Sequence, residues 1–166
     1  MPADAIEPDR LRRAFGMFAT GVTVISALHP VHGLVGMTVN SFTSVSLDPP
    51  LILFSLSRKS FTLEPLLESP AFVVNILRDG QRSLSHRFAH SGGEKWQGLS
   101  WRPAASGAPI LAGCIAFFDC VHHAQYDGGD HIVLLGRVMA MDVAAEGEPL
   151  LYFHSRYRSI GQEIDT

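Results

Sequence analysis

The sequence has few cysteines, and their placement argues against a disulfide framework. Cys114 and Cys120 are the only two among 166 residues. Six residues apart in a strand-like run, they are expected on one face and too far apart to bridge. Reduced thiols are typical of a cytoplasmic protein. A chain of this length can bury a core without such staples, so we expect one domain over residues 1–166.

Charge is also scarce, and what there is forms no block of one sign. Charged residues make up 17% of the chain, hydrophobic residues 46%, and the net charge is −3. This low charge content favours an oligomer that buries surface. Without a Lys or Arg cluster we expect no nucleic-acid binding. The longest apolar runs, such as residues 49–56, are too short to span a bilayer, and residues 1–10 lack the apolar core of a signal peptide.

The common nucleotide-binding and hydrolase motifs are missing. The chain contains no G-x-G-x-x-G, no P-loop and no G-x-S-x-G. His86 and His90 have a spacing that could suit a metal, but Arg87 stands where a zinc motif carries glutamate. We therefore expect no metal site there, and two histidines near a helix C-terminus explain the pattern equally well.

What the sequence does contain is a succession of β-branched segments separated by turn residues. Helices are predicted over residues 7–19 and 81–90. Strands are predicted over residues 22–26, 34–47 with a bend, 51–56, 71–77, 110–126, 131–143 and 149–154. Asp127-Gly128-Gly129 predicts a hairpin turn, and residues 57–60 a polar turn that opens a short helix capped by Ser57 or Ser60. Residues 91–109 form a long loop, suited to a lid or a subunit arm. The sum favours a mainly antiparallel closed or split barrel.

The segment from Gly36 to Ser60 is the strongest candidate for a ligand site. It packs small hydroxyls and one amide between apolar anchors. A flavin ring is flat and largely apolar with a hydrogen-bonding pyrimidine edge, which Asn40 and Ser41 could match. Hydroxyls, amides and cations for a phosphate follow downstream at Ser55, Ser57, Arg58, Lys59 and Ser60. A Ser/Thr-rich barrel strand with a solvated turn would have the same composition, so both interpretations stay open on the residues alone.

A series of short motifs extends this observation over nearly the whole chain. They are residues 18–24 (FATGVTV), 36–42 (GMTVNSF), 44–50 (SVSLDPP), 75–77 (NIL), 129–131 (GDH) with 136–138 (GRV), and 149–153 (PLLYF). Each motif is weak alone, but their order and spacing resemble the short-chain flavin reductase family, the reductase partners of two-component monooxygenases.

The resemblance implies a fold and an activity. The fold would be an FMN-binding split β-barrel, antiparallel with Greek-key connectivity and a few peripheral helices, that forms a homodimer. The activity would be that of an NAD(P)H:flavin oxidoreductase, which transfers hydride from NADH or NADPH to FMN or FAD and supplies reduced flavin to a partner monooxygenase. The chain has no conspicuous Arg pair for a 2′-phosphate, which favours NADH.

The resemblance also implies roles for particular residues. The flavin ring and ribityl chain would be contacted by Thr38, Val39, Asn40 and Ser41. The ring edge and the phosphate would be contacted by Ser55, Leu56, Ser57, Lys59 and Ser60. Arg87 and Phe88 would approach the phosphate end, and Tyr157 the flavin region. His131 would be the catalytic residue that faces the nicotinamide, although a histidine beside a turn is common without any function.

Three other functions remain open at this level. One is a non-catalytic FMN-binding electron carrier. Another is an FMN-dependent oxidase, or a ferric or cobalt-corrin reductase, on the same barrel. The third is a split-barrel interaction or haem-handling protein without a flavin. Hydride transfer between nicotinamide and flavin needs no acid–base pair from the protein, so the lack of one does not argue against a reductase.

Overall fold

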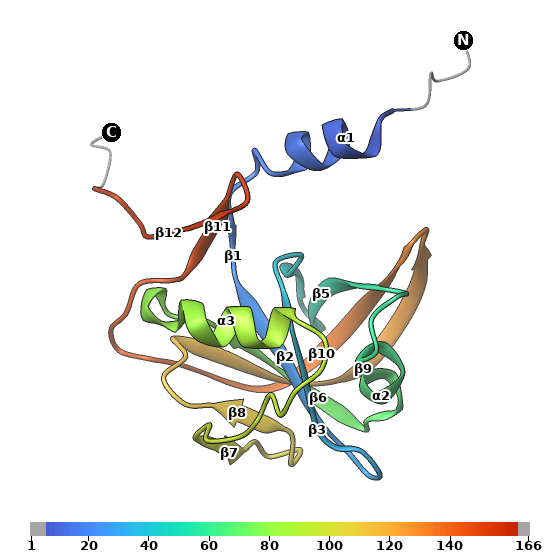
Figure 1. Cartoon of the computed structure of the whole chain (residues 1–166). Coiled ribbons are helices and arrows are strands. Elements are labelled where there is room, and N and C mark those ends of the chain that lie inside the picture. The colour runs from blue at the N-terminus through green and yellow to red at the C-terminus, as the bar shows by residue number, and fades with distance from the viewer. Residues whose placement is uncertain (1–5, 163–166) are drawn as a thin grey trace.

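The computed structural model describes residues 6–162 and is built around one seven-stranded antiparallel sheet (Figure 1). Its strand order is β3-β2-β6-β9-β10-β5-β4. The strands are β2 (Thr23–His29), β3 (Gly33–Val39), β4 (Thr43–Leu47), β5 (Pro50–Ser57), β6 (Ala71–Ile76), β9 (Ala116–Gly128) and β10 (His131–Val143). The mainly β, antiparallel architecture predicted from the sequence is confirmed. Residues 1–5, part of the segment where no signal peptide is expected, and residues 163–166 lie outside the described residues.

Shorter elements surround this sheet. A small sheet joins β1 (Thr20–Gly21), β11 (Leu151–Phe153) and β12 (Arg156–Arg158), and a hairpin joins β7 (Trp101–Pro103) and β8 (Pro109–Leu111). The helices are α1 (Pro8–Phe15), α2 (Leu63–Glu68) and α3 (Arg82–Ala89), the last preceded by the 3₁₀ turn η1 (Asp79–Gln81). Among residues 6–162, none of the helices has the length and hydropathy needed to cross a bilayer.

Two predicted strands prove to be two elements each, and a third is followed by a further strand. Residues 34–47 divide into β3, which pairs with β2, and β4, which pairs with β5. Residues 110–126 divide into β8 and β9, and the last strand continues through a tight turn into β12. An alternating pattern identifies extended chain but does not show where the chain changes partner. The predicted hairpin turn is confirmed, with Gly129 and Asp130 between the paired residues Gly128 and His131.

Two apolar clusters hold the sheet and α3 together. The first fills the barrel interior with fully buried side chains such as Phe54 and Phe72, whose rings meet edge to face 5.3 Å apart. The second lies beneath α3, where Phe88 is 1% exposed and packs with Val24 and Leu77. Because α3 is fixed by this second cluster, the segment that follows it is held against the face of β3.

The two cysteines do not lie on one strand. Cys114 lies in the turn before β9 and Cys120 within β9, so the prediction of a shared strand was wrong; both are free. Burial raises the pKa of the Cys114 thiol to about 11 and that of Cys120 to about 12. Both therefore remain protonated near neutral pH and are poor nucleophiles.

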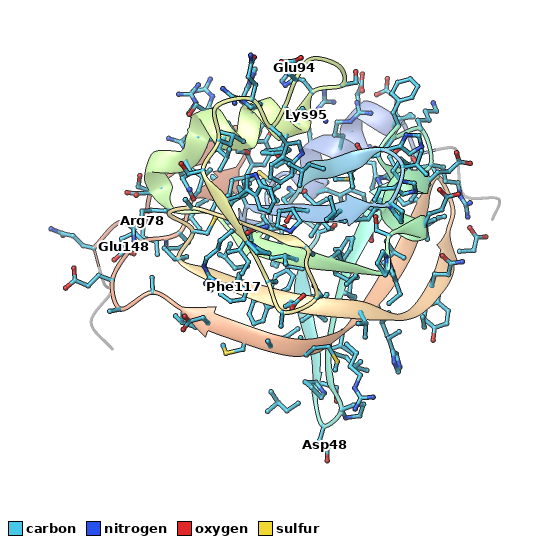
Figure 2. The ribbon with its side chains drawn as sticks, turned by 90° about the horizontal axis from the view of Figure 1, so that it is seen from below. Asp48, Arg78, Glu94, Lys95, Phe117 and Glu148 are labelled. Atoms are coloured by element: carbon cyan, nitrogen blue, oxygen red, sulfur yellow. The ribbon has the colours of Figure 1, made fainter. Side chains whose placement is uncertain are left out.

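The N-terminal helix α1 packs differently from an ordinary amphipathic helix. It projects away from the main sheet beside the β11–β12 hairpin, and none of its residues is buried (Figure 1). Phe15 is 69% exposed and Phe18, just beyond the helix, 78% exposed. The β4–β5 hairpin also projects, with Asp48 at its tip and the neighbouring Leu47 exposed (Figure 2). The apolar spacing over residues 7–19 predicted a helix correctly, but not that its apolar residues would lie outside the core.

Candidate functional site

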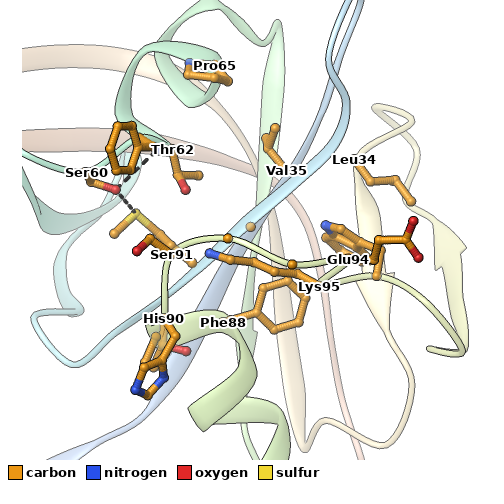
Figure 3. Close-up of a pocket in the computed structure, with 18 of the residues that line it drawn as sticks. Leu34, Val35, Ser60, Thr62, Pro65, Phe88, His90, Ser91, Glu94 and Lys95 are labelled. Carbon is orange, nitrogen blue, oxygen red and sulfur yellow. Dashed lines mark hydrogen bonds between the residues drawn. The ribbon is translucent and has the colours of Figure 1, made fainter.

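A cavity of about 930 Å³ opens between β3, the turn after β5 and the loop that follows α3 (Figure 3). Its volume is in the range of small-molecule binding pockets. One wall is β3 with α2, another the turn 57–62, and the third residues 88–97. The lining residues are Leu34, Val35, Gly36, Met37, Thr38, Ser57, Lys59, Ser60, Phe61, Thr62, Pro65 and all residues from Phe88 to Gln97.

The β3 wall can accept α3 closely because residue 36 is a glycine. A Cβ built on Gly36 would lie 2.7 Å from Cε1 of Phe88 and 3.2 Å from Cζ2 of Trp96. One turn earlier on α3, the Ser85 carbonyl accepts a hydrogen bond from Thr38 Oγ1 at 2.6 Å. Steric fit and this hydrogen bond therefore hold α3 in register along β3.

The turn after β5 brings hydroxyls and a cation to the opposite wall. Ser57, Lys59 and Ser60, which the sequence analysis expects to contact a phosphate, all line the cavity. The helix that follows begins at Leu63, after Thr62, so the prediction that Ser57 or Ser60 caps it was wrong. Instead the Ser60 hydroxyl accepts the backbone N–H of Thr62 at 3.2 Å and so shapes the turn itself (Figure 3).

The loop over residues 90–97 closes the third side, and analysis of the sequence missed most of it. Figure 3 shows the Lys95 side chain extending over the cavity. Partial burial lowers the pKa of Lys95. Trp96 meets Phe88 edge to face at 5.1 Å, and its buried indole N–H has no hydrogen-bond partner among the described residues. The unusual length of the loop predicted over residues 91–109 was the signal of a role in the sequence.

Arg87 and Tyr157 act on the cavity from outside it. Arg87 donates a hydrogen bond to the Gln97 carbonyl at 2.9 Å, which ties the loop to α3. The Tyr157 hydroxyl lies 2.9 Å from the hydroxyl of Ser85, the residue whose carbonyl accepts the hydrogen bond from Thr38. Neither side chain lines the cavity, so each would support a ligand there indirectly.

The remaining predicted flavin contacts fall into the framework or at the surface. Leu56 and Val39 belong to the barrel core, which leaves their backbones as the only groups that could meet a ligand. Ser41 Oγ accepts the Ser55 N–H at 2.9 Å and so joins the segment after β3 to β5. Asn40 lies exposed in the bend after β3. Of the predicted set, the structure therefore gathers five residues around the cavity: Thr38, Ser57, Lys59, Ser60 and Phe88.

His131 lies next to the cavity although it is distant from it in sequence. It opens β10 directly opposite Ser57 of β5, and facing residues of an antiparallel pair have side chains in contact range. Its Nδ1 hydrogen-bonds the Asp130 carboxylate at 2.7 Å. That hydrogen bond and the nearby imidazole lower the pKa of Asp130.

Arg58, expected to offer its charge to a phosphate, is engaged elsewhere. Its guanidinium donates to the Gly129 carbonyl at 2.8 Å and to Asp127 Oδ1 at 2.6 Å. It thus fixes the β9–β10 turn, and with it His131, against the end of β5. The cations left at the cavity are Lys59 and Lys95, offset in part by Glu94.

His86 and His90 do not assemble with further ligands. Their rings lie 4.1 Å apart, and Nδ1 of His90 already hydrogen-bonds the His86 carbonyl. Across residues 6–162, no group of three or more His, Cys, Asp or Glu side chains has the arrangement of a metal site.

The residues around the cavity fit a flavin mononucleotide unit. Val35, Met37 and Phe88 offer an apolar wall for a flat ring, Thr38 offers a hydroxyl for the ribityl chain, and Ser57 and Ser60 offer hydroxyls for a phosphate. Lys59 and Lys95 supply charge for a phosphate. The unpaired indole N–H of Trp96 marks the loop as a part of the site whose polar groups are not all satisfied by the protein.

Comparison with known proteins agrees with this geometry. The chain is 37% identical over 163 residues to the reductase subunit HsaB of a flavin-dependent monooxygenase from Mycobacterium tuberculosis, covering 97% of this chain and 87% of the relative. It is 39% identical over 142 residues to a probable flavin reductase of Rhizobium meliloti, covering 86% of this chain but only 46% of that longer protein.

The chain is also similar to a solved structure, in sequence and in fold. An NADH:FAD oxidoreductase of Streptomyces globisporus, in complex with NAD and FAD fragments, superposes with a TM-score of 0.89 at 36% identity, over 98% of this chain and all of that chain. The mainly β split-barrel fold expected from the sequence is thereby confirmed. The family model described as flavin reductase like domain matches residues 15–161, and the chain belongs to this family.

Proposed function

We propose that this protein transfers hydride from NADH to a flavin and delivers the reduced flavin to a monooxygenase. The observation that carries the proposal is the cavity that gathers Thr38, Ser57, Lys59, Ser60 and Phe88, with His131 beside it on β10. The names of the relatives support the same activity, since they include a monooxygenase reductase subunit and an NADH:FAD oxidoreductase. Residues 1–166 would act as one flavin reductase-like domain.

The protein's part in this reaction is positioning. A bound flavin would supply the hydride acceptor, N5, and the nicotinamide would supply the hydride from C4. Phe88 and β3 would support the ring, and the turn 57–60 would hold the phosphate end. His131 would orient the amide of a nicotinamide stacked on the flavin ring, and the loop 90–97 would exclude water from the stacked rings. Lys59 and Lys95 would stabilise the negative charge of the reduced flavin.

The assay that tests the function is NADH oxidation with added flavins. We expect flavin-dependent oxidation of NADH with FAD, FMN or riboflavin, and slower oxidation of NADPH. A protein that binds flavin but oxidises neither nicotinamide would instead be an electron carrier. A colourless protein that fails to bind any of the three flavins would contradict the proposal.

Replacement of His131 is the test of the nicotinamide side of the site. The His131→Ala protein should show a KM for NADH raised about tenfold, the loss typical of one hydrogen bond to a polar ligand group. Flavin affinity should stay within a factor of two or so, because the lost contact is to the other substrate. Steady-state kinetics and flavin titration measure the two values, and an equal loss in both would remove the nicotinamide role.

Replacement of Lys59 and Ser60 is the test of the phosphate side. Lys59→Ala and Ser60→Ala should each weaken FMN binding about fivefold to tenfold, since each removes a donor to a charged group. Riboflavin has the same ring without the phosphate and should bind these variants as it binds the parent protein. Calorimetric titration gives both constants, and a parallel loss for the two flavins would place the phosphate elsewhere.

A homodimer is part of the proposal. The exposed Phe15 and Phe18 on the projecting α1 segment, and Leu47 on the projecting β4–β5 hairpin, are apolar surfaces that a second copy of the chain would cover. We expect sedimentation to give twice the chain mass. Phe15→Asp with Phe18→Asp should shift the protein to monomer, and Arg13→Asp serves as a control that changes charge on α1 without removing apolar area.

We also propose that the protein works in the cytoplasm. Its two free cysteines, Cys120 buried and Cys114 partly buried, suit a reducing compartment, which is also where an NADH-consuming reductase finds its substrate.

A further inference from the structure

Arg58 carries a charge that none of the roles proposed above uses. It lies in the turn 57–60 between Ser57 and Lys59, which both line the cavity, but Arg58 itself does not line it. Its guanidinium extends instead to the β9–β10 turn, which belongs to the other side of the site. Arg58 therefore connects the turn that would hold a phosphate with the turn that precedes His131.

Three hydrogen bonds run from Arg58 to the β9–β10 turn. Its backbone N–H donates to the Asp130 carbonyl at 3.0 Å. In the side chain, Nε donates to the Gly129 carbonyl at 2.8 Å and Nη2 donates to Asp127 Oδ1 at 2.6 Å. Because the guanidinium is planar and rigid, two of its N–H groups on two acceptors fix both the distance and the orientation of the β9–β10 turn.

The β9–β10 turn owes part of its shape to this guanidinium. The Asp127 oxygen that Arg58 binds also accepts the Gly129 N–H at 3.2 Å. The hydrogen bonds from Arg58 and from that N–H lower the pKa of the Asp127 carboxyl, which keeps it ionised at neutral pH. Gly129 has a φ of +74°, and a glycine can leave such a conformation as easily as it adopts it. Arg58 and Asp127 together therefore hold a turn whose backbone is intrinsically free.

The position of His131 depends on the position of this turn. His131 follows Gly129 by two residues and faces Ser57 at the start of β10. Its Nδ1 hydrogen-bonds the Asp130 carboxylate at 2.7 Å, which leaves Nε2 as the ring nitrogen for a ligand. Arg58 holds the carbonyls of the two residues that precede His131, so it fixes both the backbone that carries the imidazole and the residue that orients it.

The same ion pair contributes little to the stability of the fold. The side chains of Arg58 and Asp127 are 46% and 79% exposed, and exposed ion pairs add little to the free energy of unfolding. The turn 57–60 has its own hydrogen bond, from the Ser60 N–H to the Ser57 carbonyl at 3.0 Å. An Arg58→Ala protein keeps this bond and the backbone bond to Asp130. Its loss would therefore be one of position and not of folding.

We propose that Arg58 is a positioning residue for hydride transfer, which holds His131 in a fixed place relative to the turn 57–60. The proposal rests on the proposed function, in which that turn holds the flavin phosphate and His131 holds the nicotinamide amide. Arg58 then keeps the nicotinamide in register with the flavin ring. A displacement of about 1 Å between reacting groups can lower a rate about a hundredfold.

The test is a double-mutant cycle between Arg58 and His131 in the NADH oxidation assay. Arg58→Ala should raise the KM for NADH about fivefold, with flavin affinity within a factor of two or so, because Arg58 does not line the cavity. In the His131→Ala protein the same substitution should have no further effect, since Arg58 acts through His131. An equal rise in KM in both backgrounds, or a parallel loss of flavin affinity, would overturn the proposal.

Two further variants separate position from charge. Asp127→Ala removes the carboxylate at the other end of the ion pair and should raise the KM for NADH in the same way as Arg58→Ala. Arg12→Ala also removes an exposed arginine from an ion pair, with Asp9 at 2.7 Å on α1, and should behave as the parent protein. An unchanged KM in Asp127→Ala, or a raised KM in Arg12→Ala, would contradict the positioning role.

A last measurement does not depend on catalysis. In the Arg58→Ala protein, hydrogen exchange should become faster at the Gly129 N–H and stay unchanged at the Ser60 N–H. Unchanged exchange at Gly129 would show that Arg58 does not hold the turn. If the parent protein never oxidises NADH, the proposed function fails. If the parent protein oxidises NADH and Arg58→Ala does so with the same KM, only the role of Arg58 is overturned.

Discussion

A Gly36→Ala protein is expected to lose flavin affinity by about tenfold or more and to be less stable by about 1–3 kcal/mol. The added methyl would lie 2.7 and 2.9 Å from two ring carbons of Phe88, well inside contact distance. Phe88 is 1% exposed and packed beneath α3, so its ring has no space into which to move. Either α3 must shift along β3 or Trp96 must leave its position, and both changes deform the cavity.

The measurements are urea unfolding and calorimetric titration of FMN. Gly21→Ala is the matched control, because it makes the same substitution on a strand where a Cβ would meet nothing within 4 Å. It should leave both values close to those of the parent protein. Normal flavin affinity in the Gly36→Ala protein would show that the wall between β3 and α3 is not part of the binding site.

An Asn75→Ala protein is expected to lose about 2–5 kcal/mol of unfolding free energy, from two or more buried polar groups left without partners. The Asn75 side chain is fully buried in β6. Its amide N–H groups donate to the Val24 carbonyl at 3.0 Å and to Ser26 Oγ at 2.8 Å. Its Oδ1 accepts the Leu111 N–H at 2.8 Å, so one side chain joins β2, β6 and β8.

The chain runs from the loop 90–97 through β7 to β8, and Asn75 anchors β8. The Asn75→Ala substitution should therefore also loosen the loop 90–97. Hydrogen exchange should become faster at Leu111 and in that loop, in addition to the fall in stability measured by denaturant. Asn40→Ala removes an exposed amide and should change unfolding free energy by no more than about 0.5 kcal/mol. If Asn75→Ala matched that small effect, the buried network would not be what anchors β8.

The sequence predicted best those elements whose signal is local. The β-branched run 22–26 and the apolar run 51–56 became β2 and β5. β2 is buried along most of its length, whereas β5 is buried at alternate positions. The hairpin at Gly129 was predictable for the same reason, because turn residues act within a few positions. Thr38 and Ser60, both expected at a flavin site, line one cavity although 22 positions separate them in the chain.

The features that could not be predicted depend on contacts distant in the sequence. The spacing of apolar residues in α1 predicts a helix, but not which molecule covers its exposed side. The 90–97 loop has no periodicity because its conformation is set by Arg87 and by the packing of Trp96 on Phe88. Arg58 looked like a phosphate ligand because residue type alone cannot show that the β9–β10 turn already uses its charge.

The position of Trp96 gives the protein its own optical reporter. The chain has only two tryptophans, and their ring centroids lie 6.4 Å apart, with Trp96 at the cavity and Trp101 behind it. Flavins absorb in the region where indoles emit, so a flavin in this cavity would quench nearly all of the intrinsic emission. Emission lifetimes could therefore follow the arrival and departure of flavin directly, without label or turnover, in the single chain or with a monooxygenase present.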